Sequence, residues 1–142
     1  MKGQPGAHDA TWAMLGKLVK FSAVGASGVA VNTVVLFALF QLASVPLLVA
    51  SPLATEIAIA NNFIWNDYWT FGWGLGLQSD TVRRFLKFNL VSLGGLAITT
   101  GVLYELVTRL GWHYLFANLV GIGLATLWNF VLNSVWTWRE SV

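Results

Sequence analysis

Two stretches of the sequence, NNFIWNDYWTF (residues 61–71) and WNFVLNSVWTW (residues 128–138), end apolar segments in the same unusual way. Each has an Asn-Phe pair, a second asparagine four residues after the first, and then Trp-Thr. Amide side chains are poor neighbours for lipid tails or for a hydrocarbon core, so their return at corresponding places calls for a common cause.

The two stretches are 67 residues apart, and the same offset relates further residues with no gap. Lys20-Phe21 corresponds to Lys87-Phe88, and Gly28 corresponds to Gly95. Because matches of Lys, Asn, Trp and Gly carry more weight than matches of Leu or Val in an apolar chain, this register indicates an internal duplication. The predicted repeats are residues 17–75 and 84–142.

The composition indicates an integral membrane protein. Of the 142 residues, 56% are hydrophobic and only 10% are charged, whereas a soluble domain has about 25% charged residues. Positions 21–55 contain no charged residue. As one helix this run would reach about 50 Å, well beyond a hydrocarbon core of about 30 Å. The chain must therefore turn back, and ASVP (residues 43–46) is the predicted turn.

The pattern predicts an all-α integral membrane fold with four transmembrane helices, arranged as two duplicated two-helix repeats in the same orientation. Helices are expected because backbone groups in lipid must be satisfied within the segment, and the long apolar runs do not resemble barrel strands. A cytoplasmic N-terminal tail is predicted for residues 1–19 and a membrane domain for residues 20–142. The predicted spans are residues 20–43, 47–66, 86–108 and 113–136.

Charge placement predicts the orientation. Each repeat contains an even number of spans, so both repeats should enter the membrane from the same side. Seven of the eight basic residues fall on one side of the predicted spans, and only Arg109 falls on the other. By the positive-inside rule, both termini are predicted to be cytoplasmic in a multi-pass protein of the cell (inner or plasma) membrane.

Several chemistries are not indicated. The chain has no cysteine, so a thiolate metal site is excluded. His8 and His113 are isolated and are predicted to lie at opposite membrane faces, so no metal site is expected. A net charge of +2 gives no argument for nucleic acid. No carboxylate pair or activated nucleophile is visible, so we expect neither an enzyme nor a bound cofactor.

The half that reads KFxxVGASGVxVNxxVLxxL, followed by a glutamate and then NNFxWNDxWTF, resembles the GtrA-like membrane proteins. It is similar in particular to those found beside, or fused behind, polyprenyl-phosphate sugar synthases. The resemblance covers residues 17–142. It departs from the family pattern at Asp67 and Ser134, where many members carry Arg or Lys.

The resemblance implies a role in moving a polyprenyl-phosphate-linked sugar across the bilayer for cell-surface polysaccharide or glycan synthesis. A separate synthase would load the sugar onto the lipid. Because four helices enclose little volume, a homodimer or a complex with a polyprenyl-phosphate glycosyltransferase is expected, together with contacts to membrane lipids.

Such a substrate needs cations for its phosphodiester and amides, carboxylates or aromatic faces for its sugar. Arginine and lysine at the starts of the first and third spans suit phosphate, although they also suit topology and anionic lipids. The phosphate candidates are Lys20, Lys87, Arg83 and Arg84. The candidates for the sugar and the polar site are Glu56, Asn32, Asn62, Asn66, Asn129, Asn133, Trp65, Trp69 and Trp136.

The asparagines and tryptophans have simpler explanations as well. Asn62 and Asn66 share one helix face, as do Asn129 and Asn133, and each pair could hydrogen-bond neighbouring helices instead of a ligand. The tryptophans fit an interfacial aromatic belt. The glycines of the spans are expected to allow close helix approach. They are Gly25, Gly28, Gly94, Gly95, Gly121 and Gly123.

Glu56 is the sharpest single feature, because it falls near the middle of a predicted span, where an ionisable group is a functional candidate by default. Its repeat counterpart is Gly123, so the predicted site is asymmetric. Three roles are open: sugar binding, proton transfer, or a protonated structural group bonded to Asn32 or Thr99. Glu105 is expected to pair with Arg109 instead.

Two other functions remain open. The chain could be a non-transporting membrane anchor or assembly subunit for a cytoplasmic glycosyltransferase, in which case changes in the loop at residues 67–84 would abolish recruitment. It could also be a proton-coupled exporter of small molecules that uses Glu56. The repeated asparagines and the many tryptophans favour a sugar over a hydrophobic cation.

Overall fold

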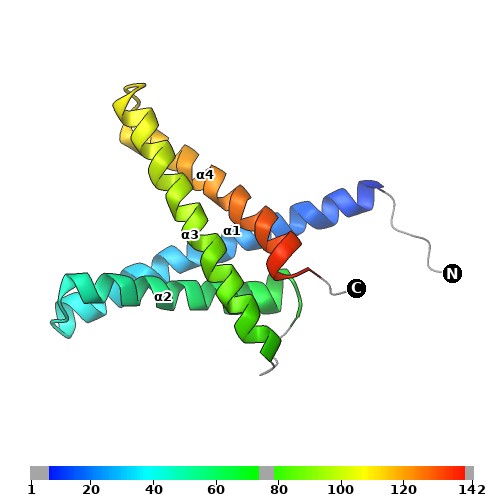
Figure 1. Ribbon diagram of the computed structural model, residues 1–142, viewed down its shortest axis with the longest axis horizontal. Helices are drawn as coiled ribbons and strands as arrows, with labels where there is room; N and C mark the ends of the chain where they lie inside the picture. The colour runs from blue at the N-terminus through cyan, green and yellow to red at the C-terminus, as the bar shows by residue number, and fades with distance from the viewer. Residues whose placement is uncertain (1–6, 74–78, 140–142) are drawn as a thin grey trace. The chain divides into compact units, whose positions relative to one another are not determined.

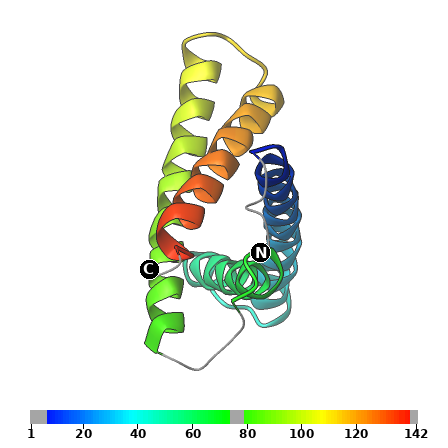
Figure 2. The same cartoon turned by 90° about the vertical axis from the view of Figure 1, so that its right-hand side faces the viewer.

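The computed structural model of the chain describes residues 7–73 and 79–139, and all regular structure in these ranges is helical. The chain divides into two compact units, Met1–Leu75 and Gly76–Val142. Each unit is a helical hairpin whose two long helices run side by side (Figure 1 and Figure 2). We call them the first hairpin and the second hairpin.

The first hairpin begins with α1 (Ala7–Phe37), which continues into a short π-helical turn, η1 (Ala38–Leu42). After a tight turn the chain returns as α2 (Leu47–Trp65), which ends in a second π-helical turn, η2 (Asn66–Thr70). Helix α2 contains Pro52 near its start.

The second hairpin has the same plan, except that no π-helical turn follows its first helix. Helix α3 (Ser79–Thr108) is followed by a turn, by α4 (Tyr114–Leu132) and by the π-helical turn η3 (Asn133–Thr137). The bounds of α4 and η3 are those of α2 and η2 shifted by 67 residues. The offset seen in the sequence therefore also relates the second helices of the two hairpins and their π-helical ends.

Within residues 7–73 and 79–139, four helical segments are long and apolar enough to cross a membrane, which confirms the predicted all-helical architecture with four spans. They are His8–Leu42, Leu47–Thr70, Asp80–Thr108 and Tyr114–Thr137. The second and fourth segments lie close to their predicted spans. Helices α1 and α3 start earlier than predicted, at Ala7 and Ser79, because charged and polar residues end a hydrophobic run without ending a helix. Residues 7–19, predicted as part of a tail, are helical.

The turns of the two hairpins share one backbone hydrogen bond at the offset of 67. Val45 N donates to Leu39 O at 2.9 Å, and Trp112 N donates to Leu106 O at 3.0 Å. One residue in each turn has a positive φ, 55° at Ser44 and 67° at Gly111, a conformation that is uncommon outside glycine. The turn predicted at residues 43–46 is confirmed.

The buried residues of the two hairpins match at the same offset. Ala50, Ala54 and Ala58 form the buried stripe of α2, and Ala117, Gly121 and Ala125 form that of α4. Small residues at every fourth position let two helix backbones approach closely, which is how helices pack without a hydrophobic driving force between them.

Candidate functional site

The π-helical turns that end α2 and α4 each start at a buried asparagine. Phe71 N donates to Asn66 O and Trp138 N donates to Asn133 O, both at 2.9 Å. These bonds reach back five residues, so each turn is wider than an α-helical turn. Such bulges are frequent at functional sites.

The side chains of Asn66 and Asn133 lie inside their own hairpins, with 1% and 0% of their surface exposed. Thr70 Oγ1 donates to Asn66 Oδ1 at 2.8 Å, and Thr137 Oγ1 donates to Asn133 Oδ1 at 2.6 Å. This burial and bonding favour the structural explanation for these two amides, because a ligand would have to displace packed residues to reach them.

Asn62 and Asn129 lie one turn earlier, against glycines of the facing helix. A Cβ on Gly95 would lie 2.6 Å from Asn129 Nδ2, and a Cβ on Gly28 would overlap the Asn62 amide. The Oδ1 atoms of both asparagines are buried and have no hydrogen-bond partner. The close approach expected at Gly28 and Gly95 is confirmed. Each hairpin therefore has one buried amide oxygen, beside this glycine, that accepts no hydrogen bond.

The close approach also holds for Gly94, which faces Trp128, and for Gly121, which faces the backbone of Thr99. It is wrong for Gly25 and Gly123, where a Cβ would meet nothing within 4 Å. A glycine in an apolar helix therefore marks close contact only on the face turned towards the partner helix.

Each hairpin places a lysine over a tryptophan. Lys20 Nζ lies 5.5 Å from the centre of the Trp69 ring, and Lys87 Nζ lies 5.1 Å from that of Trp136. Lys87 Nζ also donates to the backbone oxygen of Trp136 at 3.1 Å. A cation over an indole face gains about 0.5–1 kcal/mol when exposed and more when desolvated. The contacts hold both ammonium groups beside the π-helical turns.

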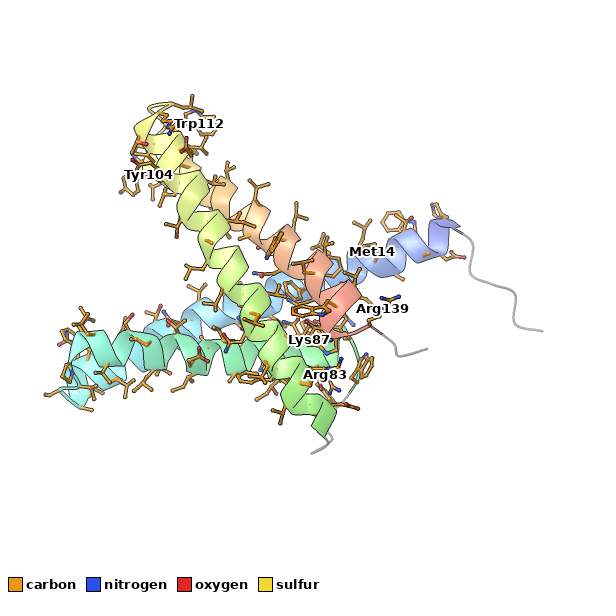
Figure 3. The ribbon with its side chains drawn as sticks, in the orientation of Figure 1. Met14, Arg83, Lys87, Tyr104, Trp112 and Arg139 are labelled. Carbon is orange, nitrogen blue, oxygen red and sulfur yellow. The ribbon has the colours of Figure 1, made fainter. Side chains whose placement is uncertain are left out.

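The other predicted phosphate candidates lie near the start of α3. Arg83 is exposed. Arg84 is only 8% exposed, and its Nη2 donates to Thr81 Oγ1 at 3.3 Å. Within the second hairpin, Arg83, Lys87 and Arg139 lie at the open end, whereas Tyr104 and Trp112 lie at the turn (Figure 3).

The remaining predicted polar residues of the first hairpin lie farther towards its turn. Glu56 is exposed on α2. Asn32 on α1 is half-buried, and its Oδ1 accepts from Thr55 Oγ1 at 3.5 Å. Thr55 thus brings a hydroxyl to the amide of Asn32, and Glu56 follows it in the same turn of α2.

Trp65 and Trp69 line a groove of about 420 Å³ in the first hairpin. Ala23, Val24 and Ser27 of α1 form its other wall, and Tyr68 completes the aromatic side. Trp136 of the second hairpin is 44% exposed.

Sequence reasoning did not single out Asn61. Its Nδ2 is buried and has no hydrogen-bond partner. The residue at the corresponding place in the second hairpin is Trp128, whose Nε1 donates to Val91 O at 3.3 Å. A position-by-position comparison of the two repeats would have identified Asn61 and Trp128, because the two side chains differ strongly in volume and polarity.

In the described ranges, 7–73 and 79–139, no three His, Cys, Asp or Glu side chains are grouped so that they could hold a metal ion.

The expected pair at the turn of the second hairpin is confirmed, with Arg109 Nε 3.1 Å from Glu105 Oε2. The other charged and amide side chains of the candidate site can form hydrogen bonds and ion pairs.

Comparison with known proteins places this arrangement in a family. Residues 20–138 match the GtrA/DPMS transmembrane domain. The chain is 42% identical over 123 residues to a dolichol-phosphate mannosyltransferase of Pyrococcus furiosus, a match that covers 86% of this chain but only 34% of that enzyme. It is 29% identical over 128 residues to the uncharacterized membrane protein YngA of Bacillus subtilis, covering 88% of this chain and 81% of YngA.

The chain thus spans about a third of the mannosyltransferase that it matches. The family match extends over both hairpins from residue 20 to residue 138, and it includes η2, η3 and both lysine–tryptophan contacts. The chain is a multi-pass membrane protein that belongs to the GtrA/DPMS transmembrane-domain family, as its sequence resemblance indicated.

Proposed function

We propose that this protein assists the movement of a polyprenyl-phosphate-linked sugar across a cell membrane and catalyses no covalent chemistry itself. Family membership supports a link to polyprenyl-phosphate sugar metabolism. The name of the Pyrococcus furiosus relative, a dolichol-phosphate mannosyltransferase, identifies a lipid of the same class. We place both termini in the cytoplasm, where the sugar would be loaded.

The observation that carries the proposal is the pair of matched lysine–tryptophan contacts. Lys20 and Lys87 each hold an ammonium group beside an indole at the π-helical end of a hairpin. Tryptophan prefers the membrane interface, which is also the depth of a lipid phosphate. A cation held there is suited to the phosphodiester, because charge-assisted bonds to phosphate are about twice as strong as neutral ones.

As the lipid crosses the membrane, the sugar would pass polar groups deeper in the protein. Glu56, Asn32 and the unused Oδ1 atoms of Asn62 and Asn129 supply acceptors within the hydrophobic segments. Polar groups at this depth are costly and are retained where they bind a substrate or another helix. We assign Glu56 to the sugar or to a proton, and we assign Asn66 and Asn133 to the support of the π-helical turns.

A second function is favoured by one specific observation. The chain corresponds to only 34% of the mannosyltransferase. This alternative assigns the transferase activity of that enzyme to the part without a counterpart here, and gives a membrane domain of this kind the role of holding such a part at the bilayer. In this alternative the chain is an anchor or assembly subunit that recruits a separate glycosyltransferase. A homodimer, or a complex with that enzyme, is compatible with both functions.

Reconstitution tests the two functions against each other. Purified protein in vesicles that contain a short-chain polyprenyl-phosphate sugar is expected to expose inner-leaflet sugar to an enzyme added outside, faster than vesicles without protein. Co-purification with a polyprenyl-phosphate glycosyltransferase, in the absence of any such movement, would support the anchor and contradict translocation.

A further inference from the structure

The groove of the first hairpin lies beside a lysine. Its volume of about 420 Å³ falls in the range of about 300–1,000 Å³ usual for ligand pockets. Its lining is almost wholly apolar and half of it is aromatic. Positions 20, 23, 24 and 27 share one face of α1, so Lys20 stands at the edge of the same wall that Ala23, Val24 and Ser27 form.

The position of Lys20 limits the kind of ligand. Its Nζ lies 5.5 Å from the ring of Trp69, and Trp69 itself lines the groove. A ligand with an apolar part in the groove would therefore have an attached anion within reach of the ammonium group. The chemistry fits an apolar chain that ends in a phosphate.

In the second hairpin an indole lies against the counterparts of two residues that line the groove. The indole of Trp128 packs over Gly94, where a Cβ would lie 2.8 Å from Nε1, and Nε1 donates to Val91 O. Val91 and Gly94 are the counterparts of Val24 and Ser27, two residues that line the groove.

In the first hairpin the residue that corresponds to Trp128 is Asn61, whose side chain is much smaller. By the repeat register, a short amide stands in the first hairpin at the position from which the second hairpin places an indole against Val91 and Gly94. The buried Nδ2 of Asn61 has no hydrogen-bond partner, so the amide does not replace the bond that Trp128 makes. The two hairpins have a similar backbone but differ here in the space that is open to a ligand.

We propose that this groove holds the isoprene units next to the phosphate of a polyprenyl phosphate, with the phosphate at Lys20, and that Trp128 closes the second hairpin to the same ligand. The inference rests on the proposed function and names the part of the lipid that the first hairpin recognises. Branched, unsaturated isoprene units suit an apolar wall of three aromatic rings. The sugar hydroxyls would find few partners there, so the sugar lies outside the groove.

An exchange between the hairpins tests the proposal. The variant Asn61→Trp/Ser27→Gly gives the first hairpin the pair that the second already accommodates, so the fold is expected to be retained. The matched control is the reverse exchange, Trp128→Asn/Gly94→Ser. Binding of a C15 prenyl phosphate to detergent-solubilised protein is measured by native mass spectrometry, with a dioleoyl phosphatidate competitor that carries the same headgroup on ordinary acyl chains.

The groove-filling variant is expected to weaken prenyl phosphate binding at least tenfold, while the control retains a ligand at wild-type affinity. Equal affinity in wild type and the groove-filling variant overturns the proposal, as does displacement by phosphatidate at equal concentration. A diazirine-bearing prenyl phosphate provides a second measurement on unaltered protein. Cross-links are expected on the first hairpin, and cross-links mainly on the second overturn the proposal even if the variant fails to fold.

Binding of prenyl phosphate and movement of the lipid-linked sugar are measured in separate experiments. The groove proposal and the proposed function can therefore be contradicted independently. Wild-type protein that binds prenyl phosphate in the groove but moves no lipid-linked sugar contradicts the proposed function alone. A groove-filling variant that moves the lipid-linked sugar at the wild-type rate contradicts the groove alone.

Discussion

The side-chain amide of Asn129 lies directly against Gly95, so closely that a Cβ on this glycine would be 2.6 Å from Asn129 Nδ2. An alanine at position 95 must therefore push the amide away or separate α3 from α4. Overpacking of this kind costs about 1–3 kcal/mol. Gly95→Ala is expected to lower the stability of the protein in detergent, measured by thermal unfolding, by an amount in that range.

Gly101→Ala is the matched control, because a Cβ at Gly101 meets nothing within 4 Å. It is expected to be neutral or slightly stabilising, since alanine is the better helix former. Equal unfolding temperatures for the two variants would show that the amide does not fix the distance between α3 and α4.

The hydrogen bond from Thr137 to Asn133 gives a second prediction. Thr137→Val keeps the shape of the side chain but leaves Asn133 Oδ1 without its donor in a fully buried place. Polar bonds within membrane proteins average about 0.6 kcal/mol, and an orphaned buried acceptor costs about 1–3 kcal/mol. A loss of roughly 1 kcal/mol of unfolding free energy is therefore expected.

Thr126→Val is the control for this bond, because Thr126 Oγ1 donates only to the backbone oxygen of Ile122 within the same helix. Its effect should be close to zero. A double-mutant cycle with Asn133→Ala separates the pairwise part, and a coupling energy of zero would contradict the role assigned to this pair.

The two lysines carry the third prediction. Lys20→Gln and Lys87→Gln each remove a cation that lies over an indole. Losing one charge-assisted bond to phosphate costs about 1.5–3 kcal/mol, which corresponds to roughly ten- to hundredfold slower movement of the lipid-linked sugar. Arg139→Gln removes the same charge from an exposed site and is expected to leave the rate unchanged. Equal slowing by all three variants would mean that these basic residues act by setting the orientation in the membrane and not by binding phosphate.

The pair formed by Glu105 and Arg109 is expected to matter little. Their side chains are 52% and 73% exposed, and exposed pairs of this spacing are worth about 0.3–0.5 kcal/mol. Arg109→Gln should shift the unfolding free energy by no more than this and leave transport intact. A loss of transport in this variant would mean that the turn of the second hairpin takes part in function.

Hydropathy and charge were sufficient to predict the number of helices and their turns. The run without charges after Lys20 was too long for one crossing, and ASVP could only be a turn. Hydropathy could not predict where α1 and α3 begin, because a helix can continue beyond the apolar residues that lie in the hydrocarbon core of the membrane. It also gave no sign of the π-helical turns, which depend on how far back the backbone bonds reach.

The candidate site was predictable in its composition and less so in its geometry. The pairing of Lys20 with Lys87 indicated symmetric cations, but their contacts with Trp69 and Trp136 depend on how each π-helical turn presents its indole. The two asparagines of each motif looked equivalent in sequence. They differ in the structure because Asn133 bonds to a threonine of its own turn, whereas Asn129 faces a glycine.

The central claim is that the protein moves a lipid-linked sugar and that Glu56 takes part. The most direct measurement follows the accessibility of a short-chain polyprenyl-phosphate sugar to an external enzyme in vesicles that contain wild type, Glu56→Gln or the control Glu105→Gln. Rapid protein-dependent exposure is expected for wild type and the control, and a large loss is expected for Glu56→Gln. No exposure with wild type, in vesicles where a known flippase is active, would contradict it.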